Sequence, residues 1–250
     1  MRGDASAAKI IDTIGSNLQA VKERIARAAA AAGRSAQSVT LLAVSKTFGP
    51  DAVRAAYAAG QRAFGENYVQ EALAKIDALA ELRGALEWHL IGPLQSNKTR
   101  VVAERFDWVH TVDRAKIAER LAEQRPAGLP PLQLCLQVNV SGEPTKAGVA
   151  PAALPALAAA VAALPPERVR LRGLMALPAP AAGFDAQRRP HRELHVLWQQ
   201  LCDAGLALDT LSTGMSADLE AAIAEGATIV RVGSAIFGTR GAGASDRALG

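Results

Sequence analysis

The chain has 250 residues, half of them apolar, which is enough for one large globular domain or two small ones. Its net charge of +4 is scattered along the sequence, with no basic and aromatic pattern typical of nucleic-acid binding. No apolar segment has the length of a membrane span or the form of a signal peptide, and the two cysteines lack metal-ligand spacing. These features predict a soluble cytoplasmic protein with no nucleic-acid partner, no membrane partner and no metal site.

The first predicted element is a helix. Its apolar face is formed by residues that recur at spacings of four and three, namely Ile10, Ile14, Leu18, Val21 and Ile25. Gly33 follows this face and is typical of a helix end, where glycine readily adopts the left-handed conformation. The helix precedes every predicted strand, so it is additional to the repeating pattern that follows.

Strand-like and helix-like segments alternate through the rest of the chain. Short aliphatic or β-branched runs indicate strands at Val39–Ser45, Arg62–Gly65, Leu86–Ile91, Trp108–Val112, Leu132–Val140, Val169–Leu177, Thr210–Thr213 and Thr228–Val232. Helix-like segments fill the gaps at Asp51–Ala59, Val69–Leu82, Lys98–Arg105, Arg114–Gln124, Pro151–Leu164, Arg188–Asp203 and Ala217–Glu225. Alternation of this kind predicts parallel strands joined by crossover helices.

This pattern predicts an α/β protein with a single (β/α)8 TIM barrel over residues 1–240 and an extra N-terminal helix. An open doubly wound sheet is the alternative, but it usually begins with a GxGxxG turn, and none follows the first strand. We expect the N-terminal helix to cover the bottom of the barrel. Ala179–Gln187 is predicted to be a long loop, and Gly241–Gly250 a flexible tail.

Polar residues collect where the predicted strands end, which is the face of a barrel that carries its chemistry. Lys46 directly follows the first strand, Gly214-Met215-Ser216 follows the seventh, and Gly233-Ser234 follows the eighth. Loops after the last two strands commonly bind phosphate, and Ser216 stands at the start of a predicted helix whose N–H groups favour an anion. Capping by Ser216 is the simpler interpretation, but the second glycine–serine pair favours an anion site.

Lys46 and Arg231 indicate what else such a ligand would meet. A lysine that ends a buried strand is expected to be partly desolvated, which favours the neutral amine that attacks an aldehyde, although a solvated loop lysine is the alternative. Arg231 lies among β-branched residues, where it either forms a salt bridge or donates to a pyridine nitrogen. An amine, a phosphate cradle and an arginine for a ring nitrogen together suggest pyridoxal 5′-phosphate (PLP).

Two other polar residues have simpler interpretations. His89, within the third strand, is predicted to be a core histidine with satisfied hydrogen bonds rather than a catalytic base. Lys146 lies on the loop after the fifth strand and is predicted to be solvated. A more speculative hypothesis makes Lys146 a transient acceptor of PLP at the barrel mouth.

Five blocks of sequence, in order, resemble the YggS/PROSC family, the pyridoxal phosphate homeostasis proteins. The blocks are Leu42–Thr47, Phe64–Glu71, Trp88–Lys98, Leu211–Asp218 and Val230–Gly238. The resemblance extends from about Val39 to Arg240, and five ordered blocks are far more specific than any one of them. It implies a barrel like the N-terminal domain of alanine racemase, with PLP bound to Lys46 as an internal aldimine.

The same resemblance implies roles for the other residues of the site. Asn67 lies beside the cofactor, Arg231 faces the pyridine nitrogen, and the phosphate is held by Gly214, Met215, Ser216, Gly233 and Ser234. Family members are regarded as carriers or regulators of the PLP pool without robust catalytic activity, and they are usually described as monomers. PLP-dependent apoenzymes are the implied transient partners.

The main alternative is a PLP-dependent amino-acid racemase or another fold-type III enzyme, and a cofactor-free aldolase that uses Lys46 is a third hypothesis. Racemases of this class resemble a two-base system, with a tyrosine from a second, β-rich domain opposite the lysine. Little chain follows the eighth strand, so we expect no second domain, and the only tyrosines are Tyr57 and Tyr68. The missing opposite base and the weak electron sink beside Arg231 favour a carrier.

Overall fold

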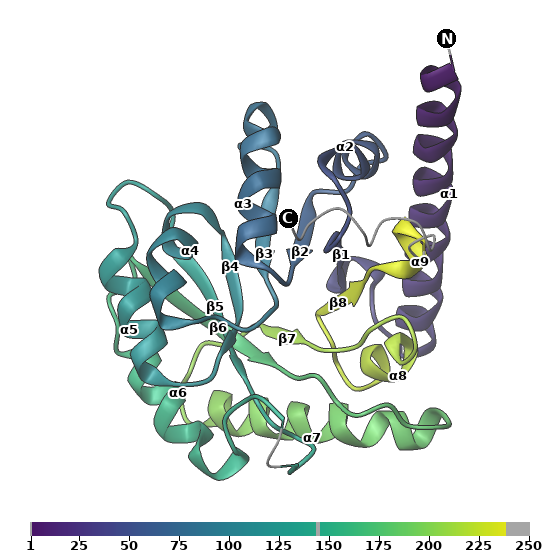
Figure 1. The fold of residues 1–250 in the computed structure, drawn as a ribbon. Helices are drawn as coiled ribbons and strands as arrows, with labels where there is room; N and C mark the ends of the chain where they lie inside the picture. Colours follow the sequence, from purple (N-terminus) through teal and green to yellow (C-terminus); the bar gives the residue numbers. More distant parts are fainter. Residues whose placement is uncertain (1, 144–145, 239–250) are drawn as a thin grey trace.

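Eight parallel strands close into a barrel in this computed structural model, which describes residues 2–143 and 146–238, with side chains from residue 12 onward. Neighbouring strands pair in chain order, and β1 also pairs with β8, which closes the ring (Figure 1). The strands are β1 (Thr40–Val44), β2 (Ala63–Glu66), β3 (Glu87–Leu90), β4 (Trp108–Val112), β5 (Leu132–Gln137), β6 (Val169–Met175), β7 (Thr210–Ser212) and β8 (Ile229–Val232). The predicted (β/α)8 barrel is confirmed.

Helices surround this barrel (Figure 1). They are α1 (Arg2–Ala31), α2 (Pro50–Ala58), α3 (Val69–Ala78), α4 (Thr99–Arg105), α5 (Ala115–Gln124), α6 (Leu154–Ala162), α7 (Phe184–Asp203), α8 (Leu219–Ala224) and α9 (Ser234–Phe237). Among the described helices, none combines the length and the apolar character needed to cross a bilayer. The predicted tail Gly241–Gly250 lies outside the described residues.

The strands have an inner and an outer face, because successive side chains point to opposite sides. On β1, Leu42 belongs to a small apolar cluster inside the barrel, whereas Leu41 and Ala43 belong to the main core under the helices. The other members of the inner cluster come from five further strands: Ala63, Trp108, Cys135, Met175 and Ile229. The barrel interior therefore holds few apolar side chains, and polar ones occupy the rest of it.

Some predicted strands end later than the observed ones. β5 ends at Gln137 rather than Val140, because the chain leaves the sheet there and Val138 forms an isolated bridge with Val149. β6 likewise ends at Met175 rather than two residues later. These segments turn away at the upper rim, where they become loops instead of continuing the ladder.

The loop predicted over Ala179–Gln187 is wrong in its second half, because α7 begins at Phe184. Pro190 accounts for the error, since proline is tolerated best in the first turn of a helix. In the structure Pro190 lies well inside α7, where its missing N–H removes the hydrogen bond that the carbonyl of Ala186 would otherwise accept. The start of α7 is set instead by Gly183, whose φ of 85° lies in the left-handed region.

Helix α1 does not cover the bottom of the barrel, contrary to our expectation. It lies along the outside, packed against α2, α8 and α9 (Figure 1). Arg24 of α1 pairs with Glu220 of α8, and the amide of Asn17 donates to the carbonyl of Ile236 in α9 at 3.0 Å. α9 is too short to cover β8 and β1, so α1 takes the place of the helix that would follow β8.

The apolar face of α1 is buried as predicted. Ile14, Leu18, Val21 and Ile25 are each at most 5% exposed, while the side chain of Ile10 lies outside the described part. Gly33, just beyond the helix end, has a φ of 68°, which confirms its predicted conformation. Burial of this face therefore holds α1 against the barrel.

Removal of that contact should destabilise the whole protein. Leu18→Ala is expected to lower the free energy of unfolding by about 2–5 kcal/mol, because Leu18 is fully buried and its removal leaves a cavity. Urea unfolding followed by circular dichroism measures the change. Leu129→Ala, the same substitution at a 37% exposed loop position, is the control and should cost far less. Equal losses for the two variants would contradict the packing role of α1.

Candidate functional site

Lys46 lies at the upper rim of the barrel, two residues beyond the end of β1. The alternation of β1 places Leu42, Val44 and Lys46 on its inner side and Ser45 on its outer side. Ser45 is buried but Lys46 is exposed, so the expected desolvation of this lysine is wrong for the described structure. The reason is that the strand ends at Val44, so Lys46 lies beyond the packed interior at this end of the barrel.

The closing strand β8 places Gly233 beside Lys46. Leu42 pairs with Arg231 and Ala43 with Val232, so Gly233 follows at the same end of the barrel. A Cβ on Gly233 would lie 3.1 Å from the carbonyl oxygen of Val44, which means that the two backbones approach closely there. The loop after β8 and the loop that carries Lys46 are therefore adjacent.

The loop after β7 reaches the same place. The backbone N–H of Arg231 donates to the carbonyl of Gly214 at 3.0 Å, which ties this loop to β8. Gly214 has a φ of 94°, and a Cβ there would lie 2.4 Å from the Cβ of Ala222, so both conformation and space require glycine. The structure thus brings Lys46, Gly214 and Gly233 to one end of the barrel.

Ser216 is not at the start of a helix, contrary to the prediction. α8 begins at Leu219, and Ser216 lies in the turn before it, half-buried, beside the exposed Met215. The N–H of Met215 donates to Asp218 Oδ1 at 2.7 Å, and this bond closes the turn that precedes the helix. Ser234, in contrast, does begin the short helix α9.

Asp218 and His191 hold this turn from below. His191, buried on α7, lies 2.8 Å from Thr213 Oγ1 through Nδ1 and 3.1 Å from Asp218 Oδ2 through Nε2. Burial alone would raise the pKa of Asp218, but the bonds from His191 and from the Met215 N–H outweigh it and leave that pKa below its ordinary value. Asp218 is therefore a carboxylate that fixes the backbone of the glycine–serine loop.

Arg231 is buried in the barrel interior beneath these loops. Its Nη1 donates to the carbonyl and to the Oγ of Ser212, each at 2.7 Å, and its Nη2 donates to the carbonyl of Ala176 at 2.8 Å. Burial lowers its pKa to about 10, so the guanidinium stays charged at neutral pH. Within the described residues Arg231 forms no salt bridge, so of the two interpretations of this arginine the ion pair is wrong.

Those bonds leave the Nε–H and one Nη2 hydrogen of Arg231 without a recorded partner among the described residues. An acceptor such as a ring nitrogen fits this unused donor capacity. Ser212, which orients the guanidinium, did not emerge from the sequence. Its position two residues before Gly214, on the inner side of β7, is the signal that would have identified it.

A buried ion pair on the outer side of β1 holds the loop that carries Lys46. Lys75 of α3 donates to Glu66 Oε1 at 2.7 Å and to the carbonyl of Ser45 at 2.6 Å, and it pairs with Glu71 at 2.8 Å. Ser45 Oγ also donates to Glu66 Oε1, at 2.5 Å. Burial raises the pKa of Glu66, and the charge of Lys75 opposes that shift.

The other end of this cluster fixes an unusual backbone conformation. Thr47 has a φ of 67°, in the region that favours glycine, and its N–H donates to Glu71 Oε1. Lys75 and Glu71 therefore hold the residues on both sides of Lys46. The spacing of four between Glu71 and Lys75 on a predicted helix is a signal for the pair, but not for its contact with Ser45.

Asn67 lies half-buried directly after β2, one strand along from Lys46. Its backbone is in close contact with the end of β3, since a Cβ on Gly92 would lie 2.0 Å from the Asn67 carbonyl oxygen. Only glycine allows this approach, so the Ile91-Gly92-Pro93 segment sets the position of Asn67. The structure records no hydrogen bond for the Asn67 side chain among the described residues, which leaves its amide available at the mouth.

His89 agrees with its simpler interpretation, whereas Lys146 is less solvated than predicted. His89 is buried with both ring nitrogens bonded, to Glu87 and to His110. Lys146 is half-buried and lies 3.7 Å from Glu143 on the same loop. Neither residue is needed to explain the group of residues at the barrel mouth.

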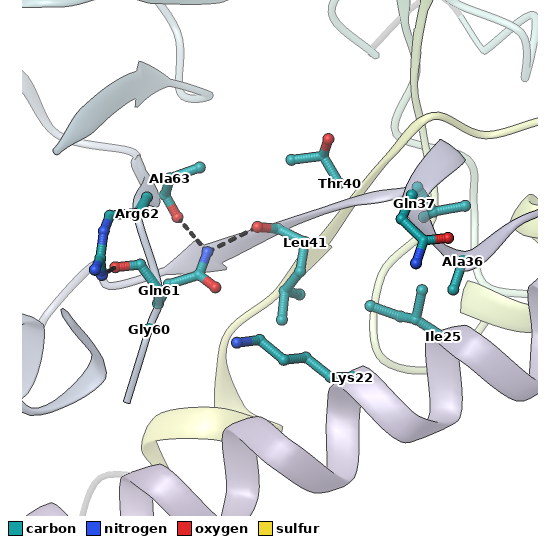
Figure 2. Close-up of a pocket in the computed structure, with 11 residues that line it drawn as sticks. Lys22, Ile25, Ala36, Gln37, Thr40, Leu41, Gly60, Gln61, Arg62 and Ala63 are labelled. Carbon is teal, nitrogen blue, oxygen red and sulfur yellow. Dashed lines mark hydrogen bonds between the residues drawn. The ribbon is translucent and has the colours of Figure 1, made fainter. Parts of the chain in front are cut away.

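A separate pocket lies at the opposite end of the barrel. It has a volume of 390 Å³ and is bounded by Lys22 and Ile25 of α1 and by the residues that begin β1 and β2 (Figure 2). The amide of Gln61 donates to the carbonyls of Leu41 and Ala63, each at 2.8 Å, and so satisfies the backbone there. Because β1 runs upward from this pocket to Lys46, the pocket does not belong to the site at the mouth.

Comparison with known proteins identifies the family of this chain. Residues 16–241 match the family model described as alanine racemase, N-terminal domain. A protein from Pseudomonas aeruginosa named pyridoxal phosphate homeostasis protein is 61% identical over 94% of this chain and 99% of its own length. The structure of PipY from Synechococcus elongatus, with PLP bound, is 40% identical with a TM-score of 0.79, over 90% of this chain and all of that one.

More distant structures share the barrel alone. Alanine racemase from Corynebacterium glutamicum has a TM-score of 0.65 at 18% identity, over 96% of this chain but only 64% of the racemase. The curated relative, by contrast, aligns over nearly its whole length. On this identity and coverage, the chain belongs to the family of pyridoxal phosphate homeostasis proteins, the YggS/PROSC family.

Proposed function

We propose that this chain binds PLP at the mouth of its barrel and serves in intracellular PLP homeostasis as a carrier or regulator of the PLP pool. The observation that carries the proposal is that an exposed lysine, a buried arginine with unused donors and two glycine loops meet where β1 pairs with β8. The 40% identical PipY, solved with PLP bound, supports the same ligand. Bound PLP supplies an aldehyde and a ring that can act as an electron sink.

Each residue at the mouth has a role in this proposal. Lys46 provides the amine for the covalent link, since it reaches into the mouth from β1. The two loops tied together by the bond from Arg231 to Gly214 hold the phosphate through Gly214, Met215, Ser216, Gly233 and Ser234. Asn67 lies beside the ring, and Arg231 donates to the ring nitrogen.

Arg231 also supports the assignment of a carrier over an enzyme with robust turnover. A guanidinium that stays charged at neutral pH donates a hydrogen bond to the ring nitrogen without transferring its proton. The ring nitrogen then stays unprotonated, which makes the ring a weak electron sink. Tyr57 is turned towards Arg62, whose guanidinium lies 4.2 Å from the ring centroid, so it does not serve as a base opposite Lys46. We further propose that the protein acts in the cytoplasm as a monomer that passes PLP to apoenzymes.

Lys46→Ala is expected to abolish covalent binding while leaving the fold intact. The purified wild-type protein with PLP should be yellow, and borohydride reduction followed by mass spectrometry should place the label on Lys46. Lys116→Ala, an exposed lysine of α5, is the control and should label as the wild type does. A label on another lysine instead of Lys46 in the wild-type protein would contradict the assignment.

The carrier role is tested by proton exchange at the α-carbon of an amino acid. We expect the PLP-loaded protein to introduce negligible deuterium from solvent into the α-position of alanine, because the ring beside Arg231 is a weak electron sink. NMR of alanine in deuterium oxide measures the exchange, with an alanine racemase as the positive control. Turnover comparable to that of the racemase would favour the alternative enzyme.

The buried pair under Lys46 should stabilise both the fold and the site. Lys75→Met leaves Glu66 buried without its cation, so the free energy of unfolding should fall by about 3–5 kcal/mol, and PLP labelling of Lys46 should fall with it. The double variant Glu66→Gln with Lys75→Met removes both charges and should recover most of the stability. Urea unfolding provides the measurement, and a double variant no more stable than Lys75→Met would show that the ion pair is not the cause.

A further inference from the structure

A continuous series of hydrogen-bonded side chains crosses the barrel interior beneath the proposed cofactor site. Glu87 Oε1 lies 2.7 Å from His89 Nε2, and His89 Nδ1 lies 2.9 Å from His110 Nε2. His110 Nδ1 lies 2.8 Å from Ser212 Oγ, which accepts from Arg231 Nη1 at 2.7 Å. These five residues, called here the interior chain, link the half-exposed start of β3 to the arginine under the mouth.

The interior chain is buried everywhere except at Glu87. His110 and Ser212 are completely buried, and His89 stacks on Trp108 with ring centroids 5.2 Å apart. Complete burial, with the positive charge of Arg231, holds the pKa of His110 well below its ordinary value, so this imidazole is neutral. A neutral imidazole has one donor and one acceptor, and both of its neighbours are within hydrogen-bond distance.

The two ends of the interior chain determine the direction of its hydrogen bonds. Arg231 can only donate, so Ser212 Oγ accepts from it and has its own hydrogen to give. If Ser212 donates to His110 Nδ1, then His110 Nε2–H donates to His89 and His89 Nε2–H donates to the carboxylate of Glu87. Every bond is made, with both histidines neutral, and each donor points from the arginine towards Glu87.

The opposite direction leaves a buried donor unsatisfied. It requires a doubly protonated His89 that donates to His110, and His110 would then donate to Ser212 Oγ. That oxygen would accept twice, and the described residues offer its hydrogen no other acceptor. An unpaired buried hydroxyl hydrogen is costly, so the first direction is favoured.

Other charged groups near the interior chain do not change this assignment. Arg172 lies over the outer face of Trp108 with its guanidinium 4.8 Å from the ring centroid, and it is paired with Asp209. Burial raises the pKa of Cys135 to about 12, so the thiol beside Arg231 is neutral. Among the carboxylates of the described residues, Asp218 is the one whose negative charge raises the pKa of Arg231.

We propose that His110 is a positioning residue that acts through Ser212 to hold Arg231 in the orientation that donates to the cofactor ring nitrogen. Ser212 occupies both hydrogens of Nη1 with its carbonyl and its hydroxyl. This holds the guanidinium so that, within the described residues, its Nε–H and one Nη2 hydrogen have no partner. The hydroxyl keeps that role only while its own hydrogen is accepted by His110. This inference rests on the proposed function, because it concerns the same arginine.

Two substitutions separate the two nitrogens of His110. His110→Asn places an amide oxygen near the position of Nδ1, so it keeps the partner of Ser212 and loses the contact with His89. His110→Gln places its amide near the position of Nε2, so it does the reverse. We expect the Asn variant to bind PLP and to absorb light as the wild type does. The Gln variant should show a changed absorbance band and a dissociation constant for PLP that is about tenfold higher. A change of that size is expected for loss of a hydrogen bond to a charged group.

Two further variants separate positioning from packing. Ser212→Ala should reproduce the effect of the Gln variant, since it removes the hydroxyl itself. Met175→Leu changes an apolar neighbour of Ser212 on β6 without removing any hydrogen bond of the interior chain, and should leave PLP binding unchanged. If the Gln and Ala variants bind PLP with wild-type affinity and absorbance, the positioning role is wrong.

A measurement without cofactor tests the hydrogen-bond direction independently. In protein labelled with ¹⁵N-histidine, both His89 and His110 should show the neutral form protonated at Nε2 near neutral pH, with assignments from the single variants. A His110 protonated at Nδ1 would overturn the proposal even if PLP binds normally. If wild-type protein fails to bind PLP at Lys46 while the histidine states are as expected, then the proposed function fails and the interior chain does not.

Discussion

The pairing of β1 with β8 is the constraint on which the rest of the structure depends. It joins Leu42 to Arg231, residues close to the two ends of the chain, and so places Lys46 and Gly233 at the same end of the barrel. The bond from the Arg231 amide to Gly214 then adds the β7 loop to them. In an open sheet the first and last strands would lie at different positions and the three segments would not meet. Closure of the ring therefore creates the site.

Two buried polar networks support that site from opposite faces of the sheet. On the outer face, Lys75 and Glu66 hold the backbone on which Lys46 stands. On the inner face, Ser212 and His110 lead to Arg231. Burying such groups is costly unless each of them is paired, and in both networks almost every polar atom has a partner. Among the fully buried atoms of these two networks in the described residues, the exception is Glu66 Oε2.

Periodic and local signals in the sequence predicted most of this fold. The strands, their order and the apolar face of α1 follow from patterns that need no knowledge of distant contacts. The position of α1 could not be predicted, because it depends on the shortness of α9, which leaves β8 and β1 uncovered. The start of α7 was missed because Pro190 lies inside the helix, whereas proline is typical of a first turn. The turn at Ser216 was missed because it is closed by the side chain of Asp218. Apart from Glu71, the partners of Lys75 lie outside α3, and the partners of Arg231 lie on or just after other strands, so no local pattern contains them.

The seating of α1 has a consequence for how the chain reaches its native state. This helix is synthesised first, yet it packs against α8 and α9, which are synthesised after it. The ion pair of Arg24 cannot form until Glu220 has been synthesised. While the ribosome is still adding β7 and β8, α1 lacks the contacts that α8 and α9 later provide. Contacts of such long sequence separation slow folding and leave apolar surface open to misassembly. The nascent chain thus leaves part of the apolar face of α1 exposed until α8 and α9 have been synthesised.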